Sequence, residues 1–198
     1  SAFISSVLFF AFLCVPSAPS RLCGYMYQLL KQIAITGIKT EAPPRPDEAM
    51  RALAQRLKQE VLASFAGALT IRHVDAGSCN GCELEIHACN NPYYNLEGLG
   101  IRFSASPRHA DMLLVTGPVS RHMEVALRRT YDATPDPKLV VAIGDCGCTG
   151  GIFGESYASL GRVSNVIPVD VTVAGCPPTP YAIMQGILPA IVQGKPKG

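Results

Sequence analysis

The chain has 198 residues, the length of one domain with at most a small appendage. Apolar residues make up 48% and charged residues 16%, a balance that excludes an intrinsically disordered chain. The net charge of +2, with no block of Lys or Arg, argues against a nucleic-acid partner. Eight cysteines are too few for a disulfide-stapled scaffold but more than packing alone requires, so we expect some of them to carry chemistry.

Residues 1–46 differ from the rest and are treated as a separate N-terminal region. Residues 1–15 are almost wholly apolar, but they are fewer than the roughly 18–20 that a membrane-spanning helix needs. They also lack the basic start of a signal peptide and a twin-arginine motif. The stretch is either a hydrophobic anchor or a run of non-native residues, read through from upstream of a natural start at Met26. We favour read-through, because the cysteine usage argues against export, and expect residues 1–25 to be dispensable.

A helix is predicted after the proline-rich linker at residues 41–47, EAPPRPD. Asp47 can cap it, and Ala, Leu and Val recur at spacings of three and four over residues 48–68. This pattern predicts a peripheral amphipathic helix at the start of a single α/β domain spanning residues 47–198.

From residue 69 onward the sequence alternates between strand and helix patterns. Five segments are predicted strands: 69–75, 100–106, 111–117, 138–144 and 166–175. Three segments between or after them are predicted helices: 83–91, 120–133 and 178–193. The third and fourth strands are continuous apolar runs, typical of strands buried on both faces. The alternation therefore predicts a doubly wound parallel sheet.

Cysteines follow three of these strands, each in a loop that contains glycine. Cys79 and Cys82 follow the first strand. Cys146 and Cys148 follow the fourth, and Cys176 follows the last. Because the carboxyl ends of parallel strands meet at one edge of the sheet, we expect these thiols to converge. Four converging thiolates can hold a zinc ion or an iron–sulfur cluster.

The spacing of the cysteines favours iron–sulfur over zinc. Structural zinc sites usually combine two C-x2-C pairs, whereas here Cys146 and Cys176 stand on separate loops. Cys176 precedes Pro177, a pair found in cluster-binding chains. Cys82 lies at the start of a predicted helix, whose free N–H groups favour an anionic cluster. A zinc-stabilised interaction module is the alternative that is not an enzyme.

Several segments resemble one known family, in order and at matching spacing from about residue 70 to residue 193. They are SCNGCELEI, SPRHADMLLVTGPVSRHM, LRRTYDATPDPKLVVAIGDC, GGIF and VIPVDVTVAGCPPTPYAIMQGIL. The family is the cluster-bearing small subunit shared by respiratory complex I, as its B or 20 kDa subunit, and membrane-bound energy-converting nickel–iron hydrogenases. The resemblance implies a flavodoxin-like fold and one 4Fe–4S cluster held by Cys79, Cys82, Cys146 and Cys176.

Two departures bear on the branch of the family. Complex I has adjacent cysteines at the first site, whereas this chain has Cys79 and Cys82 in the hydrogenase spacing. The segment Gly144-Asp145-Cys146 resembles the formate-hydrogenlyase type. We therefore expect the small subunit of an energy-converting hydrogenase, with the B subunit of an NADH–quinone oxidoreductase as the alternative.

Cys148 competes with Cys146 for the third ligand position. The family motif assigns Cys146, which follows Gly-Asp directly. Cys148 lies between Gly147 and the segment Thr149-Gly150-Gly151, so we expect it further out on a flexible turn, where ligation would cost more backbone entropy.

By resemblance, the chain relays electrons and has no catalytic residue of its own. The implied partners are a large subunit of the hydrogenase or complex I type, a ferredoxin-like two-cluster subunit and membrane subunits. The implied location is the cytoplasmic face of the cell membrane, as a peripheral part of the complex. Other candidate side chains receive structural interpretations: core packing for Cys89, packing or solvent exposure for His73 and His87, and first-turn helix placement for Glu83 and Glu85.

Overall fold

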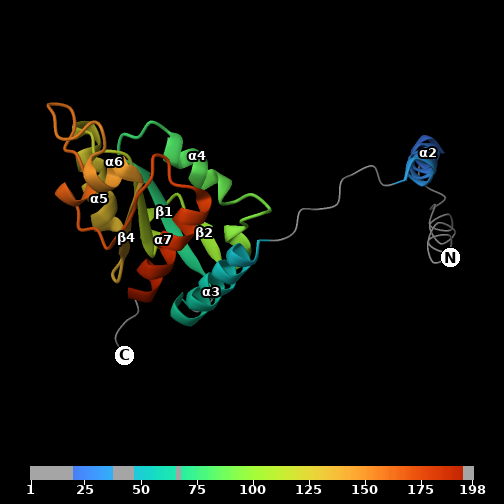
Figure 1. Ribbon diagram of the computed structural model, residues 1–198, viewed down its shortest axis with the longest axis horizontal. Coiled ribbons are helices and arrows are strands. Elements are labelled where there is room, and N and C mark those ends of the chain that lie inside the picture. The colour runs from blue at the N-terminus through green and yellow to red at the C-terminus, as the bar shows by residue number, and fades with distance from the viewer. Residues whose placement is uncertain (1–19, 38–46, 66–67, 194–198) are drawn as a thin grey trace. The chain divides into compact units, whose positions relative to one another are not determined.

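The computed structural model describes residues 20–37, 47–65 and 68–193 (Figure 1). The chain divides into two compact units, Ser1–Arg45 and Pro46–Gly198. In the first unit, α2 (Ser20–Thr36) is a helix whose side chains are exposed from Tyr27 onward. The apolar stretch at residues 1–15 lies outside the described residues, so its dispensability stays a prediction. None of the helices in the described ranges is long and apolar enough to cross a membrane.

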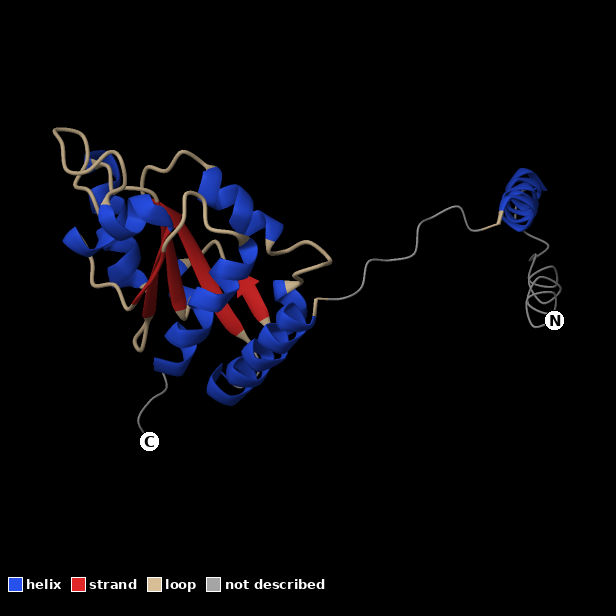
Figure 2. Cartoon of the chain, viewed as in Figure 1, coloured by secondary structure: helices blue, strands red, loops and turns tan. Residues whose placement is uncertain are grey.

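The second unit is built on a five-stranded parallel sheet with the order β2-β1-β3-β4-β5 (Figure 2). The strands are β1 (Leu69–Asp75), β2 (Ile101–Phe103), β3 (Met112–Thr116), β4 (Leu139–Ile143) and β5 (Val171–Val173). Every residue of β3 and β4 is buried, as the continuous apolar runs predicted. This strand order is the flavodoxin-like one, which confirms the predicted fold class.

Helices cover both faces of the sheet and give two hydrophobic clusters. On one face, α3 (Glu48–Phe65), α4 (Gly81–Ala88) and α7 (Pro180–Gln193) pack against the sheet. On the other, α5 (Arg121–Ala133) contributes the buried Leu127, which belongs to one cluster with strand residues Leu113, Val115 and Val140. The short α6 (Gly144–Thr149) follows β4 directly. Three 3₁₀ turns complete the described part of the unit: Leu96–Leu99, Pro107–His109 and Val163–Asn165.

The predicted amphipathic helix after the linker is present as α3. Asp47 caps it, because its carboxylate accepts a hydrogen bond of 3.0 Å from the backbone N–H of Ala49. Four side chains on one face of the helix are buried against the sheet and α7: Met50, Leu53, Leu57 and Val61. The helix is therefore part of the core and not only a peripheral cover.

Two strands are shorter than predicted, for local reasons. After β2, the Ser104 side chain accepts a hydrogen bond of 3.2 Å from the N–H of Ser106, which turns the chain. Before β5, Pro168 lacks an N–H group, and the Asp170 carboxylate accepts the N–H of Val140 at 2.7 Å. The last contacts with the neighbouring strands come from the backbone N–H groups of Ser104 and Asp170, which donate to the carbonyls of Ile71 and Val140.

Candidate metal centre

Three loops at the carboxyl edge of the sheet carry the predicted thiols. Cys79 lies between β1 and α4, Cys82 lies in the first turn of α4, Cys146 lies in α6, and Cys176 lies between β5 and α7.

The strands that lead into these loops end side by side. Thr116 of β3 pairs with both Asp75 of β1 and Ile143 of β4. Ile143 in turn pairs with Val173 of β5. The three loops therefore start from neighbouring strand ends.

The four thiols act on one another electrostatically. Burial first, then Glu83 and then the other three thiols together raise the pKa of Cys82 to about 12. Burial also raises the pKa of Cys146, followed by the thiols of Cys176 and Cys79. A thiolate disfavours a second thiolate beside it, so a site that holds all four as thiolates needs a compensating positive charge. Metal ions supply that charge.

Two glycines allow the loops to approach these sulfur atoms. Gly144 has φ of +83°, and a Cβ atom there would lie 2.6 Å from the Cys82 sulfur. Gly151 has φ of +55°, and a Cβ atom there would lie 2.9 Å from the Cys146 sulfur. Any other residue at either position would combine an unfavourable backbone conformation with a collision against a thiol.

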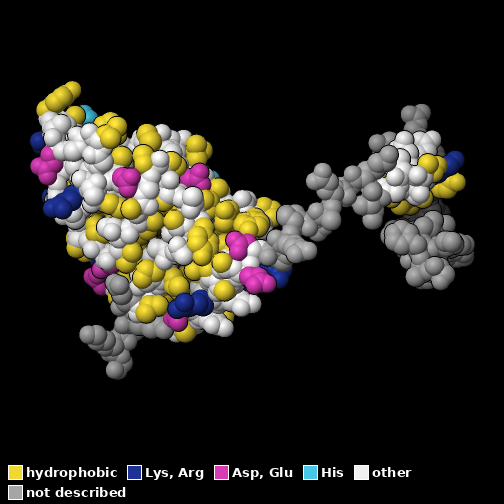
Figure 3. Space-filling model, in the orientation of Figure 1, with side chains coloured by type: hydrophobic (Ala, Val, Ile, Leu, Met, Phe, Trp, Pro, Cys, Tyr) yellow, Lys and Arg dark blue, Asp and Glu magenta, His cyan; other side chains and the backbone are white. Residues whose placement is uncertain are grey.

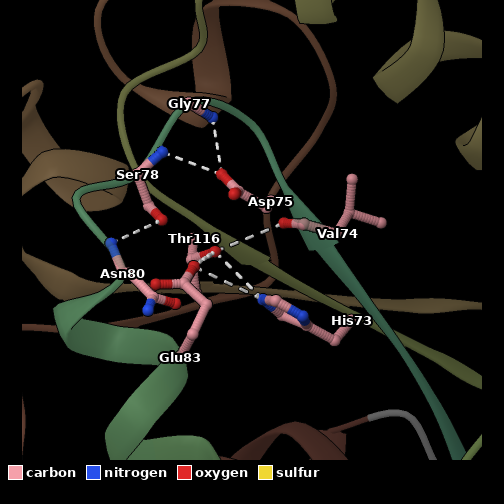
Figure 4. Close-up of polar contacts among 8 residues, drawn as sticks. All are labelled: His73, Val74, Asp75, Gly77, Ser78, Asn80, Glu83 and Thr116. Atoms are coloured by element: carbon pink, nitrogen blue, oxygen red, sulfur yellow. Dashed lines mark hydrogen bonds and ion pairs between the residues drawn. The ribbon is translucent and has the colours of Figure 1, made fainter.

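Asp75 shapes the loop that carries Cys79 (Figure 4). Its carboxylate accepts hydrogen bonds of 2.8 Å from the backbone N–H groups of Gly77 and Ser78. The Ser78 hydroxyl then accepts the N–H of Asn80 at 3.2 Å. Burial works to raise the pKa of Asp75, but these donors outweigh it and hold the pKa below its ordinary value. The loop is thus fixed from within, without help from a ligand.

Asp145 joins the second and third loops. Its backbone N–H donates to the carbonyl of Gly175 at 2.9 Å. Its carboxylate accepts the N–H of the same glycine at 2.8 Å. Since Cys146 follows Asp145 and Cys176 follows Gly175, this reciprocal pair of bonds holds the two cysteines beside each other.

The thiol site opens toward solvent. Cys79 and Cys176 are exposed, whereas Cys82 and Cys146 are half-buried. The loop after α6 adds exposed apolar side chains, with Ile152 94% and Tyr157 93% accessible. Figure 3 shows hydrophobic side chains at the tip of this region, at the upper left. Such exposure of large apolar groups is typical of a surface that another protein covers.

The described side chains are not arranged to hold a single metal ion. Within the described ranges, no three His, Cys, Asp or Glu side chains lie close enough together to hold one metal ion. A 4Fe–4S cluster needs thiolates that are further apart, because each thiolate binds a different iron. The donor set at this edge, four thiols and soft sulfur throughout, is the one that iron–sulfur clusters use.

The two remaining described cysteines lie outside this thiol set. We predicted Cys148 on a flexible turn further out, and this prediction is wrong. Cys148 belongs to α6, and its thiol lies 3.4 Å from the carbonyl oxygen of Val173, to which it donates. The helix forms because the glycine-bearing segment bonds back on itself, with Gly150 donating to the Cys146 carbonyl at 2.9 Å. Cys89 is fully buried, as predicted for a core thiol.

Sequence reasoning missed a buried polar group beside Cys82. Glu83 is only 6% exposed and accepts a hydrogen bond from the Thr116 hydroxyl (Figure 4). His73 completes the group, with Nε2 3.0 Å from the Thr116 hydroxyl oxygen and 3.6 Å from a Glu83 carboxylate oxygen. Burial lowers the pKa of His73, while Glu83 and Asp75 oppose that shift. The available signal was Thr116, a hydroxyl at the end of an otherwise apolar strand that requires a buried partner.

Comparison with known proteins decides the family. Residues 79–190 match the family described as NADH ubiquinone oxidoreductase, 20 Kd subunit. The chain belongs to this family. The matched range begins at Cys79 and includes all four candidate thiols, and the resemblance inferred from the sequence is confirmed.

The relatives are oxidoreductase subunits, and one of them is named as membrane-bound. A probable membrane-bound hydrogenase subunit of Pyrococcus furiosus is 45% identical over 69% of this chain and 84% of its own length. Formate hydrogenlyase subunit 7 of Escherichia coli is 42% identical over 68% of this chain and 53% of its own length. The B subunit of the NADH-quinone oxidoreductase of Desulfovibrio desulfuricans is 46% identical over 54% of this chain and 58% of its own length. The chain is therefore an oxidoreductase subunit.

A solved structure shares the fold as well. A chain of the membrane-bound sulfane sulfur reductase, an archaeal respiratory membrane complex, aligns with a TM-score of 0.59 and 36% identity. The alignment covers 68% of this chain and 75% of that chain. These relatives and this structure thus come from proteins whose names describe four different reactions.

Proposed function

We propose that this chain is an electron-transfer subunit that holds one 4Fe–4S cluster through Cys79, Cys82, Cys146 and Cys176. The observation that carries the proposal is that the four cysteines lie on three loops that follow neighbouring strand ends at one edge of the sheet. A bound cluster would take up and release single electrons. The protein's own contribution is to supply thiolates, shape the loops and limit solvent access.

Exposure of two thiols suggests where electrons enter or leave. Cys79 and Cys176 are the exposed members of the set, so a cluster bound here would lie at the protein surface. Electron transfer between subunits requires such a position, because a deeply buried cluster is insulated from its partner. The apolar loop after α6, with Ile152, Phe153 and Tyr157 exposed, is suited to exclude water once a partner is in place.

The hydrogenase branch is the better supported assignment. The C-x2-C spacing of Cys79 and Cys82 is the hydrogenase form. The hydrogenase and formate hydrogenlyase relatives align over 69% and 68% of the chain, against 54% for the quinone oxidoreductase relative. The second candidate is the B subunit of an NADH–quinone oxidoreductase. The large subunit distinguishes the two, since nickel-binding C-x2-C pairs in its sequence mark a hydrogenase.

The proposed assembly takes its partners from the family resemblance of the sequence. A large subunit would cover the thiol edge, and a ferredoxin-like two-cluster subunit would exchange electrons with the cluster. Membrane subunits would anchor the complex, with this chain peripheral on the cytoplasmic face. The names of the relatives support a membrane-bound complex.

Substitution of Cys176 tests the ligand assignment. Cys176→Ser should lose the cluster and, with it, stability, because cluster binding is coupled to folding. The readouts are iron content and the EPR signal of the reduced protein. Cys89→Ala is the matched control, since Cys89 is buried in the core away from the set and should keep both. Full iron content with an unchanged EPR signal in Cys176→Ser would refute the proposal.

A further inference from the structure

The helix α2 has one apolar side and one polar side from Tyr27 onward. The apolar side carries large side chains spaced three and four residues apart, here called the apolar stripe: Tyr27, Leu29, Leu30 and Ile33. The opposite side carries polar side chains at the same spacings: Gln28, Lys31, Gln32 and Thr36. Ile35 is the exception, because it follows Lys31 by one helical turn and so lies on the polar side.

The apolar stripe is exposed in the structure. All four of its side chains belong to the exposed class, with Ile33 53% accessible. The helix is nevertheless well defined at its end, where the N–H of Gly37 donates to the carbonyl of Ile33 at 3.0 Å and Gly37 has φ of +65°. A regular helix with a contiguous row of exposed apolar side chains is typical of one that binds a further surface.

The charges of this part of the chain are all positive. Residues 1–40 contain no Asp or Glu, and their three basic residues are Arg21, Lys31 and Lys39. The rest of the chain holds fourteen Lys and Arg against fifteen Asp and Glu, so the net charge of +2 comes from residues 1–40. Among the described residues, no ion pair includes Lys31. This region is therefore complementary to an anionic surface.

We propose that α2 lies on the surface of a bilayer that contains anionic lipid. The apolar stripe would enter the boundary between headgroups and acyl chains, and Lys31 would stay among the headgroups. An apolar stripe alone also fits a groove on a protein, but the lack of acidic side chains over forty residues favours anionic lipid. This lipid contact goes beyond the proposed assembly, in which membrane subunits anchor the complex, and it does not depend on the cluster. The side chains that carry it follow Met26, so it does not depend on the apolar stretch at residues 1–15 either.

Flotation of the purified full-length chain with lipid vesicles tests this contact. One set of vesicles contains phosphatidylglycerol and phosphatidylcholine in equal parts, and the other contains phosphatidylcholine alone. The chain should bind the anionic vesicles at least roughly fivefold more tightly, because each basic side chain near an anionic surface contributes about 1 kcal/mol. Added salt should reduce this difference, since it screens the attraction.

Two isoleucines two residues apart give a matched pair of variants. Ile33→Ser removes a side chain of the apolar stripe, whereas Ile35→Ser makes the same change on the polar side, where Ile35 is 73% exposed. Ile33→Ser should weaken binding to anionic vesicles roughly fivefold, because it removes buried apolar area. Ile35→Ser should weaken it less than about twofold. The two changes have the same effect on helix propensity, so a difference between them reports the side of the helix that meets the lipid.

A third variant tests the charge. Lys31→Gln should weaken binding to anionic vesicles roughly fivefold and leave binding to phosphatidylcholine vesicles unchanged. A wild-type chain that does not bind anionic vesicles would overturn the inference and leave the apolar stripe to a protein partner. Equal binding by Ile33→Ser and Ile35→Ser would also overturn it, because the stripe would then not be the contact. Iron content is measured in parallel, and a wild-type chain that floats with anionic vesicles but holds no cluster would overturn the proposed function and not this lipid contact.

Discussion

Cys146 and Cys148 show how two thiols two residues apart can differ in role. Cys146 is coupled electrostatically to Cys176 and Cys79, at the open edge of the sheet. The Cys148 thiol donates to the carbonyl of Val173 and lies 3.7 Å from the carbonyl of Ala142, and Cys146 is only a minor influence on its pKa. A thiol engaged with strand carbonyls faces the sheet, so the helix of residues 144–149 presents the two sulfur atoms to different surroundings.

We expect Cys148→Ala to keep its cluster and its electron transfer, at a stability cost of about 1 kcal/mol for the lost hydrogen bonds. Cys146→Ala should lose most of both properties. Iron content and the EPR signal of the reduced protein measure the difference. Partial rescue of Cys146→Ala by Cys148 is compatible with this assignment. A clusterless Cys148→Ala together with an intact Cys146→Ala would show that Cys148 is the ligand.

At the scale of elements, α3 stabilises the domain through one face. Leu57 is fully buried against the sheet and α7, while Leu62 on the same helix is 52% exposed. Leu57→Ala should lower the free energy of unfolding by about 2–5 kcal/mol, because it leaves a cavity in the core. Leu62→Ala should change it by no more than about 0.5 kcal/mol. Equal midpoints for the two variants in urea unfolding would contradict the burial of this face.

The sequence predicts the interior elements better than the edges. The strands at 112–116 and 139–143 are buried on both faces, so their composition alone marks them. The edge strand at 171–173 is much shorter than its apolar pattern suggested, since Asp170 bonds to the neighbouring strand through its side chain. The apolar pattern of a segment predicts its burial, but it does not show where a side chain replaces a backbone group as a hydrogen-bond partner.

The candidate site likewise has features that the sequence predicts and features that it does not. Convergence of the thiols could be predicted, because parallel topology brings strand ends together whatever the side chains are. The helix at Gly144–Thr149 could not be, since two glycines in six residues argue against a helix. The burial of Glu83 was also missed, because a carboxylate in the first turn of a helix is ordinarily explained by the helix dipole. Only the register of β1 and β3 brings Thr116 and His73 to it.

At the scale of the whole molecule, the loop after α6 predicts a docking surface for the large subunit. Tyr157 is 93% exposed, close in sequence to the Cys146 site, and a charge there should weaken an apolar contact. Tyr157→Asp should reduce co-purification of the large subunit without changing the unfolding temperature of this chain. Val192→Asp is the control, because Val192 is exposed near the end of α7, away from the thiol loops. Equal recovery of the large subunit with both variants would contradict this docking surface.

The same fold serves hydrogenase, quinone oxidoreductase and sulfane sulfur reductase relatives. An electron relay explains this range, because a relay makes no bonds and leaves the choice of reaction to its partner. On the proposed function, the chain itself would need only to hold a cluster at a surface that its partner reaches.

The most direct test of that requirement is the iron and acid-labile sulfide content of the anaerobically purified protein, combined with EPR of its reduced form. The account predicts about four iron and about four sulfide ions per chain, with an EPR signal that appears on one-electron reduction. A colourless protein that contains zinc, or an iron content of about two per chain, would contradict it.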